Sequence, residues 1–383
     1  MKWMVPINNL DVIQAKTIDD IVKNRDENHW VKGFAGTGKT IVLTHVLERL
    51  AALKPAPKVC FATYTHALKD LVESGLSREA TKRIDISTFT GLRHLRSSYD
   101  VIVADEMQDI PSRLLPTISR MSDVLIMAAD LDQSIYRSAC APAELSDAVE
   151  PANEHLLREI HRINENVFQI ATCVYTDASI APRTVVRGDK ELARLYEGAT
   201  LRDEFVTMYE EAVRVAAKER PSAILLPSKA LLDKFISMVS LANSYSSKPP
   251  SVRSQEPREV GEQANPFKEI NSYLERNDSP LQVFGGGSGS LYDSDARRMV
   301  YLMTYHSVKG LDFANVFLPH LTADTSLEPM KGASDLEERR LFFVAATRAR
   351  QRLYLSYHGE PHRFIEDISP DLLEPMSKQK RAY

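Results

Sequence analysis

Eight consecutive residues, Gly33 to Thr40, constrain this chain more than any other stretch. They follow the spacing G-x-x-x-x-G-K-[ST], with an apolar segment before them and a run with helical spacing after them. Glycines let backbone N–H groups turn toward a phosphate at a helix N-terminus, where unpaired amides and the helix dipole favour an anion. The pattern predicts a phosphate-binding loop in which Lys39 reaches the β- and γ-phosphates and the Thr40 hydroxyl holds Mg²⁺.

Two further apolar segments end in polar residues that suit the same chemistry. Residues 101–104 run directly into Asp105 and Glu106, and residues 124–129 are followed shortly by Gln133. Carboxylates at the end of a strand can coordinate Mg²⁺ and activate water. Acids at a strand end are usually only solvated, but here they follow a phosphate loop, and we therefore predict that they belong to its site.

Length and composition describe an ordinary globular chain. The 383 residues, 43% hydrophobic and 26% charged, leave room for two domains. The formal net charge is −4, so any surface for nucleic acid must be a local basic groove. Cys60, Cys140 and Cys173 fit no metal-ligand spacing and are expected in the core of a protein in a reducing compartment. Without a signal peptide or a membrane-spanning run, the sequence predicts a cytoplasmic protein that does not bind membranes.

Strand-like apolar segments alternate with helix-like segments along the whole chain. In the first half, the strand patterns are 58–63, 84–89, 101–104 and 124–129. This alternation predicts an α/β fold with parallel sheets and with ligands at the carboxyl ends of the strands. The phosphate loop, Asp105, Glu106 and Gln133 all follow such strands.

A Pro-, Ala- and acid-rich segment at 141–153 suits a domain boundary. We therefore predict one domain over residues 1–153 and a second over 154–383. Residues 242–266 are rich in Ser, Pro, Glu and Gln, and they are expected to form a flexible loop, with a partner-binding segment as the alternative. The strand patterns of the second half are 222–227, 281–284, 300–304, 315–318 and a closing strand at 352–355.

Taken in order, these segments resemble the superfamily 1 helicases of the UvrD/Rep type over most of the chain. The resemblance implies two RecA-like parallel-sheet domains in tandem, with the ATP site in the cleft between them. The two most specific matches are Thr304-Tyr-His-Ser-Val-Lys-Gly-Leu-Asp-Phe313 and Glu337-Glu-Arg-Arg-Leu-Phe-Phe-Val-Ala-Ala-Thr-Arg-Ala349. The other matching stretches are Gln14, 33–40, 61–66, 105–109, 130–136 and 161–162.

The resemblance also implies roles around ATP. Asp105 would hold Mg²⁺ together with Thr40, while Glu106 would orient and deprotonate the attacking water. Gln133 would sense the γ-phosphate. Arg162 and Arg348, both expected from the second domain, would stabilise γ-phosphate charge as arginine fingers, although a surface ion pair is the alternative for Arg348. The residues implied to bind ATP are Gln14, Gly33, Ala35, Gly36, Thr37, Gly38, Lys39, Thr40, His161, Gly310 and Asp312.

Single-stranded DNA is the second ligand that the resemblance implies, with movement in the 3′–5′ direction. Closure of the cleft on ATP binding and opening on hydrolysis would drive that movement. The motifs do not distinguish DNA from RNA. The residues implied to contact nucleic acid are Thr63, Tyr64, His66, Thr88, Thr304 and His306.

Three positions depart from the family pattern. His161 stands where a Tyr usually stacks on adenine, and Asp312 stands where a Glu usually meets the ribose. After Tyr136 the family continues to a Trp that stacks on a base, but this chain has 137–140, Arg-Ser-Ala-Cys. We therefore expect looser base selectivity and the loss of one stacking surface, worth roughly 1–3 kcal/mol per base.

The family usually carries a large insertion in each motor domain. Here the gap from Leu71 to Ile86 is far shorter than a domain of about 50 residues. At the second insertion point, residues 285–298 form a Gly-rich turn that returns almost at once to the strand at Val300. The sequence therefore predicts two bare RecA-like domains.

Two functions stay open from the sequence. The first is an ATP-driven translocase or helicase acting on DNA, which Tyr64, His306 and the arginine-rich stretch 337–349 favour. The second is a nucleotide-gated ATPase subunit that regulates a nuclease or another partner in a defence or repair complex. The low net charge, the missing Trp and the polar segment 242–266 favour this second function.

Overall fold

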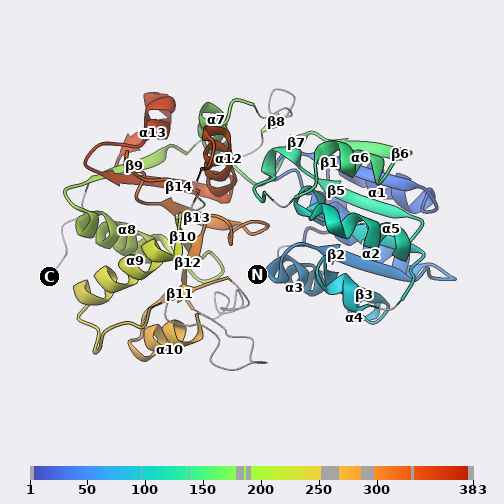
Figure 1. Cartoon of the computed structure of the whole chain (residues 1–383), viewed down its shortest axis with the longest axis horizontal. Coiled ribbons are helices and arrows are strands. Elements are labelled where there is room, and N and C mark those ends of the chain that lie inside the picture. Colours follow the sequence, from blue (N-terminus) through green and yellow to red (C-terminus); the bar gives the residue numbers. More distant parts are fainter. Residues whose placement is uncertain are drawn as a thin grey trace. The chain divides into compact units, whose positions relative to one another are not determined.

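Figure 1 shows the computed structural model of the chain, which divides into two compact units. The N-terminal unit runs to Arg162 and includes the short strand β8 (Val185–Val186), while the C-terminal unit begins at Ile163. Each unit has its own parallel sheet. The structure describes residues 4–95, 97–137, 139–177, 185–186, 191–251, 267–285, 297–328 and 332–377.

The N-terminal unit is built on a 6-stranded sheet whose neighbouring strands are all parallel. Parallel pairing brings the carboxyl ends of the strands to one edge, where the following loops can hold a ligand. In sheet order the strands are β3 (Ile84–Thr88), β2 (Val59–Thr63), β4 (Val101–Ala104), β5 (Leu125–Ala129), β1 (Asn28–Gly33) and β6 (Ala152–Leu157).

Helices cover both faces of this sheet. Val31 and Phe61 pack against α1 (Val12–Lys23), α2 (Lys39–Ala52), α3 (His66–Gly75) and α4 (Arg78–Thr81). Their strand neighbours Trp30 and Cys60 face the opposite way, toward α5 (Leu115–Met121) and α6 (Pro142–Asp147). Burial on both faces explains why these strands read as continuous apolar runs. The short elements of this unit are η1 (Ile7–Asn9), η2 (Gly91–His94), η3 (Met107–Asp109), η4 (Ser112–Leu114), η5 (Leu131–Gln133) and β7 (Glu159–Ile160), which pairs with β8.

The C-terminal unit has a 7-stranded sheet, again with parallel pairs throughout. In sheet order the strands are β11 (Leu281–Val283), β12 (Val300–Thr304), β10 (Ser222–Leu226), β13 (Phe313–Leu318), β14 (Ala349–His358), β9 (Ala193–Gly198) and β15 (Leu373–Pro375). One face packs on α8 (Leu201–Val215), α9 (Lys229–Ala242) and α10 (Lys268–Arg276). The remaining described helices are α7 (Glu165–Val174), α12 (Asp335–Ala346), α13 (Arg363–Asp367) and η8 (Pro370–Leu372).

Two parallel sheets with helices confirm the α/β class with RecA-like domains, but the domain boundary is not where the sequence suggested it. The segment 141–153 contains α6 and the start of β6, which pairs with β1 from Asn28 to Gly33. The N-terminal unit therefore continues past residue 153 to Arg162. In the β6 sequence ANEHLL three of the six residues are polar, in keeping with a strand that lies at the sheet edge and is only partly buried, so it lacked a strand-like apolar run.

Several other expectations are refined by the structure. The strand at 352–355 is part of β14, which lies between β13 and β9 and does not close the sheet. Between Leu71 and Ile86 the chain forms only the end of α3, α4 and the start of β3, so no domain is inserted there. Of the expected loop 242–266 and the turn 285–298, residues 252–266 and 286–296 lie outside the described residues. None of the helices in the described parts of the chain has the length and apolar character needed to cross a lipid bilayer.

Candidate nucleotide and nucleic-acid sites

The phosphate loop connects the carboxyl end of β1 to the N-terminus of α2. Neighbouring atoms approach its glycines so closely that a side chain would not fit. A Cβ added at Gly33 would lie 2.5 Å from Thr37 Oγ1, and one at Gly38 would lie 2.5 Å from Gln14 Nε2. Gly36 and Gly38 have φ values of 83° and 87°, which side chains rarely adopt. Ala35 and Thr37 are buried, and the Thr37 hydroxyl donates to Phe34 O at 2.9 Å. The loop thus has the backbone shape that a phosphate cradle requires.

Lys39 and Thr40 begin α2 and face the carboxyl ends of the strands. The Lys39 ammonium donates to Gly33 O at 2.7 Å and lies 3.6 Å from Asp130 Oδ2. The Thr40 hydroxyl donates to Asp105 Oδ2 at 2.6 Å, so the two predicted Mg²⁺ ligands are in direct contact. Burial and the neighbouring Glu106 charge raise the pKa of the Asp105 carboxyl. A buried carboxylate with a hydroxyl beside it fits a divalent cation, which would offset the cost of its charge.

Glu106 follows Asp105 in a strained backbone conformation. Its φ is 58° and its ψ is 39°, the left-handed region that is uncommon for residues other than glycine. Its backbone N–H donates to Asp105 Oδ1 at 2.9 Å, and its Oε2 accepts from Gln108 Nε2 at 2.5 Å. These contacts fix the Glu106 carboxylate next to Asp105 while leaving its side chain only partly buried.

Gln133 belongs to the same hydrogen-bonded group at the end of β5. Its side-chain amide donates to the Asp130 carboxylate. The backbone N–H of Asp130 in turn donates to Gln108 Oε1 at 3.1 Å. Gln108 therefore joins Glu106 to Asp130, a role that the sequence did not indicate because it depends on β4 and β5 lying side by side.

Gln14 is a buried residue of α1, although a glutamine on a polar helix is usually solvated. Only 4% of its surface is exposed, and its Nε2 donates to Thr37 O at 2.9 Å. Asp11 caps α1 by accepting from the Gln14 N–H, and its second carboxylate oxygen lies 2.6 Å from His161 Nε2. The backbone N–H of His161 donates to Gly36 O at 3.0 Å. Gln14 and His161 are therefore both attached to the phosphate loop, as their assignment to ATP binding requires.

Arg162 corrects an expectation, because it was assigned to the second domain. It lies in the N-terminal unit, and a Cβ added at Gly36 would be 3.0 Å from Arg162 Cβ. Arg162 follows β6 and β7, which belong to the N-terminal unit. Its assignment to the second domain was wrong because the expected domain boundary lay before these strands. Of the two predicted arginine fingers, only Arg348 belongs to the C-terminal unit.

Three predicted nucleic-acid residues meet at one edge of the N-terminal sheet. Thr63 and Thr88 are register partners at the carboxyl ends of β2 and β3, and Phe89 N–H donates to Thr63 O at 2.8 Å. Tyr64 follows directly, with its ring centroid 4.5 Å from that of Tyr136. The side chain of His66 lies outside the described part of the structure. The Tyr64–Tyr136 pair supplies an aromatic surface near the point where the family Trp is missing.

The predicted nucleotide residues of the C-terminal unit lie at the amino ends of β13 and β14. Arg348 directly precedes β14 and is only 2% exposed. Its guanidinium donates to Val344 O at 2.8 Å, and Leu311 O accepts from it at 3.5 Å. This burial rules out the surface ion pair that was the alternative for Arg348.

Gly310 and Asp312 lie in the turn that leads into β13. Gly310 has a φ of 80°, which favours glycine. Asp312 Oδ1 lies 2.5 Å from an Arg350 guanidinium nitrogen. Arg350 was not singled out from the sequence, because its pairing depends on β13 and β14 being neighbours.

Thr304 and His306 lie at the opposite, carboxyl edge of the same sheet, where Thr304 is the last residue of β12 and His306 follows it. Thr304 Oγ1 donates to Ser307 Oγ at 3.0 Å, which tightens the turn. His306 Nε2 is 3.2 Å from the buried Glu328 carboxylate, and burial lowers the pKa of the imidazole. Thr304 and His306 are thus at the carboxyl edge, whereas Asp312 and Arg348 directly precede β13 and β14 at the amino edge.

Family models match two parts of the chain. Residues 14–139 match an AAA domain, and residues 287–360 match the UvrD-like helicase C-terminal domain. The first match contains the phosphate loop, Asp105, Glu106 and Gln133, and the second contains both of the most specific motifs.

Relatives of known name are similar over a limited region. The ATP-dependent DNA helicase PcrA of Staphylococcus epidermidis is 36% identical over 108 residues, which cover 23% of this chain and 14% of the relative. PcrA of Bacillus subtilis is 38% identical over 104 residues, covering 24% and 14%. Among solved structures, Arterivirus nonstructural protein 10 (helicase) aligns with a TM-score of 0.41 and 16% identity, covering 88% of this chain and 61% of that one.

Proposed function

The chain belongs to the superfamily 1 helicases of the UvrD/Rep type, and we propose that it is an ATPase that couples hydrolysis to movement on single-stranded DNA. The observation that carries the proposal is the contact of Thr40 with Asp105 beside a phosphate loop, with Glu106 next in the chain. A phosphate cradle, a cation site and a carboxylate able to accept a proton are the parts that phosphoryl transfer to water requires. An ATPase assay with and without single-stranded DNA tests the proposal.

The predicted site residues of the N-terminal unit would each have a separate role in hydrolysis. Lys39, which now donates to loop carbonyls, would donate to phosphate oxygens, and the backbone of the loop would hold the β-phosphate. Thr40 and Asp105 would hold Mg²⁺, which supplies neutralisation of phosphate charge when it is bound. Glu106 would orient the attacking water and take its proton. Gln133 would contact the γ-phosphate, and its hydrogen bond to Asp130 would link this contact to Gln108.

Two arginines, one from each unit, would complete the site. Arg162 is already close to Gly36 in the N-terminal unit, whereas Arg348 would act from the C-terminal unit. Both would stabilise the charge that develops on the γ-phosphate. Dependence on a residue from each unit would make hydrolysis sensitive to their relative movement, which is the basis of a motor in this family.

We expect single-stranded DNA to stimulate hydrolysis through the Tyr64–Tyr136 aromatic pair. Tyr64→Ala should lose most of the stimulation while keeping DNA-independent hydrolysis, because the change removes a stacking surface outside the phosphate site. Tyr64→Phe is the matched control and should keep the stimulation, since stacking needs the ring and not the hydroxyl. Binding of a fluorescent oligonucleotide should weaken steeply with salt, as phosphate contacts release counterions.

A second candidate function is a nucleotide-gated subunit that regulates a partner such as a nuclease. The net charge of −4 and the pairing of His306 with Glu328 favour it, because both reduce attraction to nucleic acid. If hydrolysis is normal and no single strand, DNA or RNA, changes its rate over a range of salt, this second function replaces the first.

We expect the chain alone to unwind long duplexes poorly. The segment between Leu71 and Ile86 holds only short helices, and residues 285–298 are too few for a domain, so the surfaces that grip a duplex in the larger relatives have no counterpart at these two points. Strand separation on tailed duplexes of increasing length should fall off sharply, while translocation on a single strand persists. Efficient unwinding by a verified monomer would contradict this expectation.

A further inference from the structure

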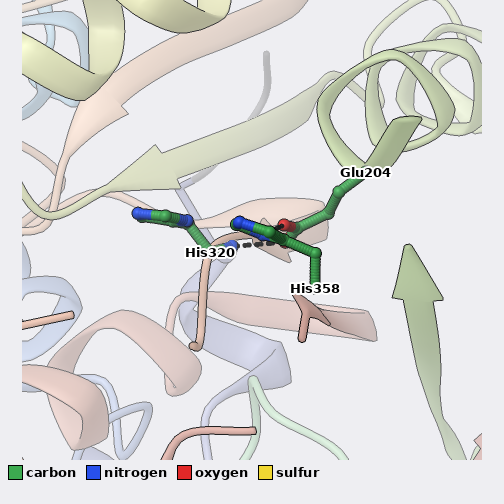
Figure 2. A group of neighbouring side chains, drawn as sticks. All are labelled: Glu204, His320 and His358. Atoms are coloured by element: carbon green, nitrogen blue, oxygen red, sulfur yellow. Dashed lines mark hydrogen bonds and ion pairs between the residues drawn. The ribbon is translucent and has the colours of Figure 1, made fainter. Parts of the chain in front are cut away.

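A group of one carboxylate and two imidazoles lies in the C-terminal unit, outside the residues used above. Glu204 comes from the first turn of α8, His320 follows β13, and His358 is the last residue of β14. Figure 2 shows Glu204 reaching from its helix toward the two rings, whose planes are nearly parallel, with an interplanar angle of 11°. Their possible ligand atoms all lie within 4.8 Å of one another. The group is at the carboxyl edge of the sheet, the edge opposite to Arg348.

The Glu204 side chain is fully buried and is held in place by several hydrogen bonds. Its side chain is 0% exposed, and a Cβ added at Gly198 would lie 2.8 Å from Glu204 Cβ, so only glycine lets α8 approach the sheet this closely. Glu204 Oε1 accepts from the backbone N–H of His320 at 2.5 Å and from the Ser356 hydroxyl at 2.7 Å. Oε2 is left facing His358 Nδ1 at 2.7 Å. One carboxylate oxygen is thus anchored, and the other is directed at the imidazoles.

His320 is the residue that a simple ion pair between Glu204 and His358 does not explain. Its ring stacks on that of His358 with centroids 5.3 Å apart, and its buried Nδ1 has no hydrogen-bond partner among the described residues. Its φ of 67° is in the left-handed region, a strain that persists only where the surroundings demand it.

We propose that Glu204, His320 and His358 form a binding site for one divalent transition-metal ion of the zinc type. Two imidazoles and a carboxylate are a known set for zinc, and ligands about 2.0–2.2 Å from the ion would be about 3.4 Å apart in a tetrahedron. The ligand atoms now lie within 4.8 Å of one another, so the side chains of the two partly exposed histidines would have to rotate to give that spacing. Imidazole ligands favour zinc, cobalt, nickel or copper over magnesium, so this site would not compete for the Mg²⁺ of the nucleotide site.

The anchoring contacts of Glu204 match what surrounds metal ligands in proteins. The His320 N–H and the Ser356 hydroxyl would orient the carboxylate from behind, leaving Oε2 for the ion. The two histidines are partly exposed, which gives an ion a way in from solvent. A bound ion would tie α8 to the ends of β13 and β14 and leave one coordination position for water.

The test is titration of the full-length chain with Zn²⁺, and with Co²⁺ as a spectroscopic probe, in excess Mg²⁺ and without nucleotide. We expect one ion per chain, Co²⁺ absorption bands typical of imidazole ligands, and a Zn²⁺-dependent rise in Tm. His358→Gln and His320→Asn, the second chosen because Asn tolerates the left-handed backbone, should each weaken binding at least about tenfold. Glu204→Gln should do the same if it folds, and circular dichroism will confirm the fold of every variant.

Two control variants test whether the ion binds at other histidines. His94→Asn removes an exposed histidine elsewhere, and His161→Asn removes a member of the only other described group of three possible ligands, Asp11, Glu159 and His161. Both should leave binding unchanged. The proposal is overturned if the wild-type chain binds no stoichiometric ion, if His320→Asn and His358→Gln bind as the wild type does, or if His161→Asn alone abolishes binding.

Discussion

Glu106→Gln should bind ATP about as well as the wild-type chain and hydrolyse it at least about a hundredfold more slowly. The change removes the group that accepts the proton of the attacking water, and general-base catalysis contributes about 10²–10⁴ in rate. The new amide oxygen can still accept from Gln108 Nε2, which now lies 2.5 Å from Glu106 Oε2, so the local structure should survive. Equilibrium binding of a fluorescent nucleotide and single-turnover hydrolysis measure the two effects separately.

Two comparison variants make this result specific to Glu106. Glu73→Gln changes an exposed glutamate on α3 in the same way and should leave turnover unchanged. Lys39→Ala should lose binding as well as turnover, because it removes a cation that holds the phosphates in the ground state. Normal turnover by Glu106→Gln would reject the assigned site, and normal turnover by Lys39→Ala would reject the phosphate loop itself.

The parts of the site that the sequence predicted are those held by short stretches of chain. The phosphate loop sets strand, turn and helix within one segment, and Asp105 and Glu106 directly follow the apolar strand β4. Parallel strands then bring these residues together without further information, since their carboxyl ends share an edge. The contact between Thr40 and Asp105 is therefore a consequence of two local patterns.

Contacts between distant elements could not be predicted in this way. Gln14 looks like any solvated glutamine until α1 is packed beside the phosphate loop, where its amide reaches Thr37 O. The edge strand β6 has polar residues at three of its six positions and no continuous apolar run, and missing it put Arg162 in the wrong unit. Glu204 and His358 are far apart in sequence, and only the order of β14 and β9 in the sheet brings them together.

Arg348→Lys should keep nucleotide binding nearly intact while reducing turnover at least about a hundredfold. A finger acts mainly on charge that develops in the transition state, and the planar guanidinium cannot be replaced there by an ammonium. Lysine can still donate to Val344 O and fill most of the buried volume. The measurement is kcat together with the nucleotide Kd. Arg352→Lys, on the strand β14 that directly follows Arg348 but with 43% of its side chain exposed, is the matched control and should change neither.

Arg348→Ala should differ from Arg348→Lys in stability. It removes the Arg348 donor from Leu311 O and from Val344 O, which keeps the Thr347 hydroxyl as a donor at 3.1 Å, and it opens a cavity. Such losses together lower the free energy of unfolding by roughly 2–4 kcal/mol. Denaturant unfolding of both variants separates this structural cost from the catalytic one. If Arg348→Lys folds normally yet loses nucleotide binding in proportion to turnover, or keeps full turnover, Arg348 is a core residue of the C-terminal unit and not a finger.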